Sequence, residues 1–236
     1  MKLNNPFRDL TKFEWGLWIV SMLVVTASFL LAPEQDVLSL CASLVGVTAL
    51  IFVAKGYVFG QILIIIFAVM YGIISFYFRY YGEMITYLCM SAPAAVFATI
   101  SWIRNPYGRT AEVKVNRLTT PLRVGMVGFT VGATLVFYFI LRALDTTNLL
   151  FSTLSVTTSM LASYLTFFRS PFYALAYAAN DIVLIVLWVL ATVENPAYLP
   201  MIFCFVMFLL NDLYGFFNWQ RMKKRQTSCN ENGNMV

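Results

Sequence analysis

The sequence predicts an all-α integral membrane protein with eight transmembrane helices. Of its 236 residues, 60% are hydrophobic and 11% are charged, and the mean hydropathy is strongly positive. This composition is typical of a chain that lies mostly in lipid. A helix needs ~20 apolar residues to cross the hydrocarbon core, and eight stretches approach that length: 14–32, 37–54, 58–78, 84–103, 122–144, 148–168, 171–192 and 198–219.

Basic residues in the loops predict the orientation, because Lys and Arg are retained on the cytoplasmic side of a membrane. With eight spans and the N-terminus inside, two basic residues fall outside, Arg79 and Arg142, and fourteen fall inside: Lys2, Arg8, Lys12, Lys55, Arg104, Arg109, Lys114, Arg117, Arg123, Arg169, Arg221, Lys223, Lys224 and Arg225. We therefore expect both termini in the cytoplasm. The net charge of +5 indicates topology and contact with anionic membrane lipid, and we expect no nucleic-acid partner.

The first span has no small-residue cleavage site and is too long for a secretory signal, so we expect it in the mature protein. Two later segments, 39–105 and 152–222, look like copies of one three-span unit. In each copy the first span ends in a basic residue, Lys55 or Arg169, and the third span ends in Trp102 or Trp219. Four spans separate corresponding helices, so the copies share one orientation. Parallel repeats build transporters whose substrate site lies near the midplane between the copies.

This repeat divides the chain into five parts. They are an N-terminal segment with its extra helix (1–36), a first three-helix repeat (37–105), a cytoplasmic loop with a linker helix (106–147), a second three-helix repeat (148–221) and a basic tail (222–236). We expect the tail to be disordered, because it follows the last apolar run.

Two Asn-Asp dipeptides, Asn180-Asp181 and Asn211-Asp212, lie inside apolar runs that have no other ionisable group away from their ends. An ionised Asp at the centre of a membrane helix costs about 2.5 to 3.5 kcal/mol, so something polar must face it. Intramembrane carboxylates most often belong to a solute or ion pathway. The candidate substrate-binding site contains both dipeptides and further polar and aromatic residues of the spans: Gln61, Tyr71, Trp102, Trp188, Tyr214, Asn218 and Trp219.

Structural roles are the alternative for several of these residues. Any single Asn or Tyr can hydrogen-bond a neighbouring helix, and Trp102 and Trp219 can be interfacial anchors. Small residues also recur at helical spacing, and we interpret them as packing seams where helices approach closely. They are a GxxxG motif in span 122–144 and a stripe along span 148–168: Gly128 and Gly132, and Ser152, Ser155, Ser159, Ser163 and Thr166.

Enzymatic and metal-binding functions find no support in the sequence. It contains no GxSxG, HExxH, P-loop or dinucleotide-binding glycine motif, and no His. The four Cys residues are scattered without CxxC spacing, which argues against a disulfide framework or a zinc site. We therefore expect a protein that is not an enzyme and has no cofactor. A transporter of this build moves its solute down a gradient or couples it to an ion.

Several short motifs carry a resemblance to a known family: Lys55-Gly56, Tyr71-Gly72, Tyr81-Gly82-Glu83-Met84, Asn105-Pro106-Tyr107, Asn180-Asp181 and the closing Asn211-Asp212-x-Tyr214-Gly215-x-x-Asn218-Trp219-x-Arg221. From about residue 37 to 222 the chain resembles the PnuC family of bacterial nicotinamide riboside transporters. The resemblance implies three plus one plus three helices related to the SWEET sugar transporters, preceded here by one extra helix. It also implies the bacterial inner membrane as location and a homo-oligomer, a trimer, as assembly.

For function, the resemblance implies facilitated diffusion of a vitamin precursor that cytoplasmic phosphorylation then traps. Nicotinamide riboside carries a pyridinium cation, a carboxamide and ribose hydroxyls. Cation-π contacts worth about 0.5 to 2 kcal/mol each would come from the aromatic side chains of Trp188, Trp219, Tyr71 and Tyr214. The carboxamide and hydroxyls of the ligand would match the side-chain amides of Asn180, Asn211, Asn218 and Gln61. Asp181 would balance the positive charge of the ring. A phosphorylated nucleotide would be excluded by Asp181 and Asp212.

Two alternatives to this function stay open. Gln61 departs from the Trp that many relatives carry nearby, and members of the family also carry other vitamins, so thiamine or riboflavin remains a candidate substrate. The other alternative is a proton-coupled carrier in which Asp181 or Asp212 titrates during transport.

Overall fold

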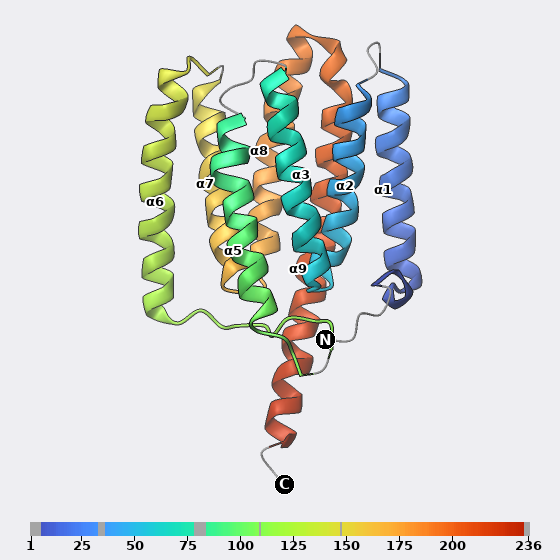
Figure 1. Ribbon diagram of the computed structural model, residues 1–236, viewed down its shortest axis with the longest axis vertical. Helices are drawn as coiled ribbons and strands as arrows, with labels where there is room; N and C mark the ends of the chain where they lie inside the picture. The colour runs from blue at the N-terminus through green and yellow to red at the C-terminus, as the bar shows by residue number, and fades with distance from the viewer. Residues whose placement is uncertain (1–5, 33–35, 78–83, 109, 147, 234–236) are drawn as a thin grey trace.

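The structure is a computed structural model that describes residues 6–32, 36–77, 84–108, 110–146 and 148–233, with side chains through Cys229 (Figure 1). The predicted positions Lys2, Arg79, Arg109 and Tyr81-Gly82-Glu83 lie outside these ranges. The helices are α1 (Lys12–Leu30), α2 (Val37–Ala54), α3 (Val58–Tyr77), a π-helical turn (Thr86–Ser91) that continues into α5 (Ala92–Ile103), α6 (Thr120–Ala143), α7 (Leu149–Phe167), α8 (Tyr173–Glu194) and α9 (Leu199–Gly233). Within these described ranges, eight helical segments are long and apolar enough to cross a membrane, which confirms the predicted number.

Each helix is an apolar run whose backbone groups are satisfied internally, as a membrane requires, and several begin at a side-chain cap. Thr11 and Glu14 form a capping box at the start of α1. The Asp36 carboxylate accepts hydrogen bonds from the backbone N–H groups of Leu38 and Ser39 at the start of α2. These caps fix where the first two spans begin.

The helices form one bundle, with α1 at one edge and α6 at the other (Figure 1). Both termini lie at the same end of the bundle, here called the termini end, and the opposite end is called the far end. Helices α2, α3 and α5 pack together, as do α7, α8 and α9, and α2 also packs against α9. Helix α6 packs mainly on α7, and a Cβ at Gly128 or Gly132 would meet nothing within 4 Å. The predicted GxxxG seam is therefore not used inside the described chain.

The prediction of a disordered tail is wrong for residues 222–233, because α9 continues as helix to Gly233 and extends beyond the bundle (Figure 1). The Gln226 side chain is buried; its amide oxygen accepts from the backbone N–H of Val115 at 2.8 Å, and its amide nitrogen donates to the carbonyl of Val113 at 3.1 Å. Arg225 forms an ion pair with Glu112 in the same loop. The loop between α5 and α6 thus holds the helix in place beyond its apolar part.

Helix α7 ends under a cap supplied by α5. The indole N–H of Trp102 donates to the carbonyl of Thr166 at 2.9 Å, and the hydroxyl of Ser101 donates to the carbonyl of Phe167 at 2.7 Å. These carbonyls belong to the last turn of α7. The carbonyl of Thr166 also accepts the backbone N–H of Arg169, so the indole is its second partner. Trp102 is fully buried, so the bond is shielded from solvent.

Helix α2 ends in the same way under a cap supplied by α9. The indole N–H of Trp219 donates to the carbonyl of Val53 at 3.0 Å, and the side-chain amide of Asn218 donates to the carbonyl of Ala54 at 2.9 Å. Trp219 is also fully buried and contacts Trp102, with 5.4 Å between ring centroids. Each three-helix group therefore caps a helix of the other group, and the two caps meet at the termini end.

The backbone turns after α2 and α7 also match. Gly56 and Arg169 both have a positive φ, 69° and 55°. Gly56 donates its N–H to Val53 and Arg169 donates to Thr166, each closing the last helical turn as in a Schellman motif. The two turns thus correspond at Gly56 and Arg169, whereas the sequence comparison aligned the basic residues Lys55 and Arg169.

Helix α1 is fastened to the bundle by a buried ionic cluster. The Glu14 carboxylate, almost fully buried, accepts from the Lys55 ammonium at 3.0 Å and from the Tyr214 hydroxyl at 2.7 Å. The Glu14 carboxylate also accepts from the backbone N–H of Thr11 at 2.6 Å. A carboxylate with this many donors is stable away from water. The cluster thereby ties α1 to α2 and α9.

We predict that Glu14→Gln lowers the free energy of unfolding by about 3 kcal/mol, because it leaves the Lys55 ammonium without a counter-charge in a mostly buried place. Guanidinium or thermal unfolding of purified protein in detergent measures the change. The double variant Glu14→Gln with Lys55→Met should recover much of the loss, since no unpaired charge remains. The control Glu112→Gln, in a more exposed pair with Arg225, should cost less than about 1 kcal/mol. Equal losses at Glu14 and Glu112 would contradict the prediction.

Candidate functional site: a cavity between the two helix groups

A cavity of about 470 Å³ lies between the two three-helix groups, within the ~300 to 1,000 Å³ typical of small-molecule sites. Its wall comes from α2, α3, α5, α7, α8 and α9 and from the far-end loops. Asp145 and Glu194 line it at the far end, and Tyr173 lines it at the termini end. The Tyr173 ring also contacts the buried Trp219, with 4.8 Å between centroids. The crossed helix caps therefore form the floor of the cavity.

Six of the predicted site residues line this cavity: Gln61, Tyr71, Asn180, Asp181, Trp188 and Asp212. They come from α3, α8 and α9, which are far apart in the sequence. The first Asn-Asp dipeptide contributes both of its side chains, and the second contributes only Asp212. Successive residues of a helix point about 100° apart, so neighbouring side chains can face different surroundings.

The other five predicted residues do not line the cavity. Asn211 points towards α1, where its amide donates to the hydroxyl of Ser21 at 3.0 Å. Tyr214 is held by Glu14 on the α1 side. Trp102, Asn218 and Trp219 cap helix ends, as described above. For Asn211, Tyr214 and Asn218 the structure shows hydrogen bonds between helices, which was the alternative interpretation of the sequence. The alternative for Trp102 and Trp219 was an interfacial anchor, and the structure instead buries both rings completely.

Asp181 of α8 and Asp212 of α9 both line the cavity, on helices that pack against each other, and are near enough to interact electrostatically. Each of these residues is only 4% exposed. The second carboxylate oxygen of Asp181 has no partner among the described residues. Two like charges this close and this poorly solvated repel, and a cation or a shared proton between them lowers the electrostatic energy. The two carboxyl groups therefore attract a positive charge into the cavity.

Asn180 is held in a fixed orientation by α7. Its amide oxygen accepts from the hydroxyl of Ser155 at 3.1 Å and from that of Thr158 at 2.8 Å. Both lone pairs of this oxygen are thereby used. The carboxamide is pre-positioned beside Asp181 before any ligand arrives, which reduces the entropy lost on binding.

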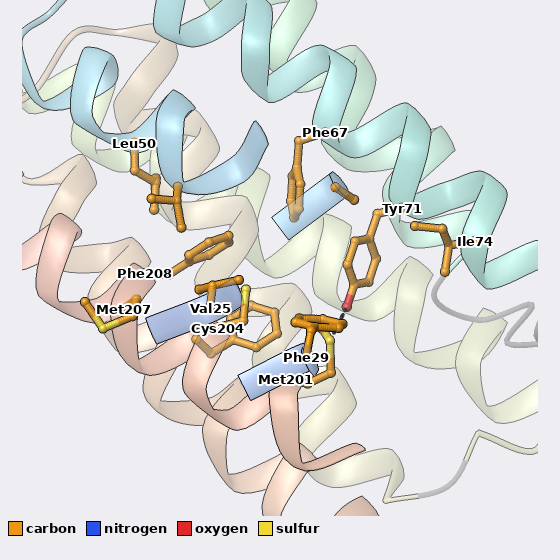
Figure 2. Packing of buried hydrophobic residues seen from close by; sticks show 13 residues of the cluster. Val25, Phe29, Leu50, Phe67, Tyr71, Ile74, Met201, Cys204, Met207 and Phe208 are labelled. Carbon is orange, nitrogen blue, oxygen red and sulfur yellow. Dashed lines mark hydrogen bonds between the residues drawn. The ribbon is translucent and has the colours of Figure 1, made fainter. Parts of the chain in front are cut away.

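Aromatic rings form the opposite part of the wall. Phe67 of α3 contacts Phe208 of α9, with 5.8 Å between ring centroids. Figure 2 shows Tyr71 of α3 pointing towards Met201 of α9, whose sulfur lies 3.4 Å from the Tyr71 hydroxyl. Phe67, Tyr71 and Phe208 belong both to this hydrophobic cluster and to the cavity wall. A Cβ at Gly46 would lie 2.6 Å from the Phe208 ring. A glycine at this position is thus required for the wall to close.

A second aromatic group lies nearer the far end. The Trp188 ring stacks at 6.5 Å on Phe205 and lies 5.6 Å from Tyr198. All three line the cavity. Flat rings with an apolar body suit a flat heteroaromatic ligand, and their faces attract cations.

The hydroxyl stripe of α7 was interpreted wrongly as a packing seam. Its five members, Ser152, Ser155, Ser159, Ser163 and Thr166, all line the cavity. The spacing was correct, but the composition carried a further signal: a seam needs only small residues, whereas five hydroxyls without one Ala or Gly indicate a face that meets water or a polar solute. Tyr87, Tyr173 and Tyr177 also line the cavity, and no sequence pattern had singled them out.

Charge in the cavity has one sign. Asp145, Asp181, Glu194 and Asp212 contribute four carboxyl groups to the wall, and the described wall residues contain no Lys or Arg. A negatively lined cleft with low-dielectric walls concentrates cations and repels anions.

Comparison with known proteins identifies the family. A family model described as "Nicotinamide mononucleotide transporter" matches residues 36–221, which is most of the chain. The chain belongs to this family, the PnuC transporters. A nicotinamide riboside transporter PnuC of Neisseria mucosa is 27% identical over 94% of this chain and 86% of its own length. One of Haemophilus influenzae is 24% identical over 89% of this chain and 90% of its own.

The PnuC assignment extends to the fold. A crystal structure described as that of the vitamin B3 transporter PnuC superposes with a TM-score of 0.79 and 27% identity, covering 92% of this chain and 94% of that one. The all-helical membrane fold predicted from the sequence is thus confirmed, and the cavity between α3, α7, α8 and α9 lies inside a PnuC-type transporter.

We predict that the PnuC cavity admits aqueous reagents from the far end. In a variant whose four native Cys are replaced by Ser, Ser159→Cys should react with a membrane-impermeant maleimide at least ~10-fold faster than Ala162→Cys, because Ser159 lines the cavity and Ala162 is fully buried. In proteoliposomes, reagent should reach Ser159→Cys from the side opposite to the one that labels a reference variant in which the exposed Cys229 is the one native Cys retained. Labelling of Ser159→Cys and of the reference Cys229 from the same side would contradict this.

Proposed function

We propose that the protein takes up nicotinamide riboside across the bacterial inner membrane, with both termini in the cytoplasm. The observation that carries the proposal is the composition of the cavity wall, which combines buried carboxyl groups, amides and aromatic rings without a positive side chain among the described residues. The names of the two PnuC relatives support the same substrate. For the orientation, basic residues such as Lys55, Arg104 and Arg169 follow helices that end at the termini end.

The chemistry of nicotinamide riboside matches this wall group by group. The pyridinium ring would stack on Trp188 or Tyr71, where desolvated cation-π contacts are worth up to about 2 kcal/mol. Its carboxamide would pair with Asn180 or Gln61. Its positive charge would be balanced by Asp181 and Asp212, and its ribose hydroxyls would meet the hydroxyl stripe of α7.

The riboside suits this cavity better than its mononucleotide, although the family model is named after the mononucleotide. A phosphate group would add about −2 charges to a cavity that already holds four carboxyl groups. One such charge ~6 Å from a carboxylate costs about 3 kcal/mol at an effective dielectric constant of ~20. No Lys or Arg of the described wall offsets that repulsion.

We also propose that the two helix groups are copies of one unit, α2–α3–α5 and α7–α8–α9, joined by α6 in the SWEET-like three plus one plus three order and preceded by α1. The crossed caps made by Trp102 and Trp219 support this arrangement, as do the matching turns at Gly56 and Arg169. Rocking of the two units about a central site would expose it to each side in turn. The substrate would then move by facilitated diffusion, and cytoplasmic phosphorylation would trap it.

A homotrimer is part of the same proposal. The open GxxxG face of α6, where a Cβ at Gly128 or Gly132 would meet nothing within 4 Å, offers a surface on which another helix can approach closely.

We predict that, in isothermal titration calorimetry of purified protein, nicotinamide riboside binds at least ~10-fold more tightly than thiamine or riboflavin, because its carboxamide and its cation both find partners. The mononucleotide should compete weakly. Asp181→Asn should weaken riboside binding ~10-fold, whereas Asn211→Ala, on the α1 side, should lower stability and leave affinity unchanged. Comparable competition by the mononucleotide would refute the exclusion of phosphate, and tighter binding of thiamine or riboflavin would change the assigned vitamin.

Proton coupling is the second candidate mechanism, favoured by the facing carboxyl groups of Asp181 and Asp212 and the unpartnered oxygen of Asp181. We predict that uptake of labelled riboside into proteoliposomes reaches equal concentrations on both sides, and that a protonophore leaves its initial rate unchanged, because a facilitator uses only the gradient of its solute. Asp212→Asn should preserve that insensitivity. A rate that collapses on adding the protonophore would establish the coupled mechanism instead.

A further inference from the structure

A second hollow, of about 780 Å³, lies outside the bundle at the termini end. It is a groove between the start of α1 and the outer face of α9, closed at one side by the α2–α3 turn and the α5–α6 loop. The residues that line it are Thr11, Phe13, Glu14, Lys55, Glu112, Leu210, Tyr214, Phe217, Asn218, Arg221, Met222 and Arg225. It shares none of them with the central cavity.

The groove carries one uncompensated positive charge. Lys55 is neutralised by Glu14 at 3.0 Å, and Arg225 is neutralised by Glu112. Arg221 is exposed, and within the described part of the chain it has no hydrogen-bond or ion-pair partner. With three cationic side chains and two carboxylates, the groove has a net charge of about +1 and therefore attracts anions.

An apolar stripe leads away from this charge into the membrane-spanning part of α9. Leu210, Phe217 and Arg221 are spaced so that they lie on one face of the helix, and Leu210 and Phe217 are 46% and 60% exposed. Phe13 of α1, 65% exposed, borders the same groove. Towards the middle of the bundle the groove is therefore bounded by apolar side chains suited to hydrocarbon. At the termini end it is bounded by the charged side chains, which suit an anion.

We propose that this groove binds an anionic glycerophospholipid. The headgroup phosphate lies against Arg221 at the mouth of the groove, and the acyl chains run along Phe217 and Leu210. A free phosphate would use Arg221 but leave the apolar stripe unexplained, and a zwitterionic lipid would use the stripe but gain little from the charge. A basic pocket at the edge of transmembrane helices is a known form of lipid-headgroup recognition. A lipid held here bridges α1 and α9 directly outside the Glu14 cluster.

Native mass spectrometry of the full chain, with phosphatidylglycerol and phosphatidylcholine of identical acyl chains, tests the proposal. Phosphatidylglycerol should be retained about fivefold more than phosphatidylcholine, and Arg221→Gln should abolish the preference. Arg221→Lys should keep most of it. The matched control Lys224→Gln removes one charge from the same helix at an exposed position outside the groove and should leave the preference unchanged.

Three results would overturn the proposal. They are equal retention of the two lipids, an equal loss of preference in Lys224→Gln, and displacement of bound phosphatidylglycerol by inorganic phosphate, which would identify a simple anion site. Size-exclusion elution of each variant checks that the chain is folded, and the Phe217→Ser variant, which should weaken retention of both lipids, tests the apolar half of the groove separately from Arg221.

Discussion

The carbonyl groups in the last turn of a membrane helix have no partner further along the same helix, and at α2 and α7 side chains of the opposite helix group supply one. Trp219 of α9 donates to the carbonyl of Val53 in α2, and Trp102 of α5 donates to the carbonyl of Thr166 in α7. Both carbonyls also accept a backbone N–H from the turn that follows the helix, so each indole adds a second hydrogen bond that forms only when the two groups are together. The two buried indoles lie at one end of the central cavity, and Asp145 and Glu194 line its opposite end.

The selectivity proposed for the central cavity depends on how little water its carboxyl groups meet. Asp181 and Asp212 are almost without solvent, so a charge beside them would interact far more strongly than at a surface. In the proposed function, the Asn180 amide and the aromatic rings would select for hydrogen bonding and shape, and the carboxyl groups would select for positive charge. These criteria are independent, and a flat cationic nucleoside would meet all of them.

The sequence predicted the parts of this arrangement that depend on local composition. Hydropathy located every span, and the cost of a buried carboxylate located Asp181 and Asp212. It did not separate Asn211 from Asp212, because the direction of each side chain depends on where α1 packs, nearly two hundred residues away. The helical tail was missed for a similar reason: Gln226 is held by the backbone of a loop more than a hundred residues earlier, and no local pattern records such a partner.

The ionic cluster around Glu14 has a consequence for biogenesis. During synthesis α1 leaves the ribosome before α2 and α9, and its carboxylate can meet Lys55 after only 41 further residues, but it meets Tyr214 only after 200. Helix α1 can therefore complete its contacts with the bundle only after α9 has been released. A chain interrupted before α9 would hold α1 through Lys55 alone and would leave it loosely docked.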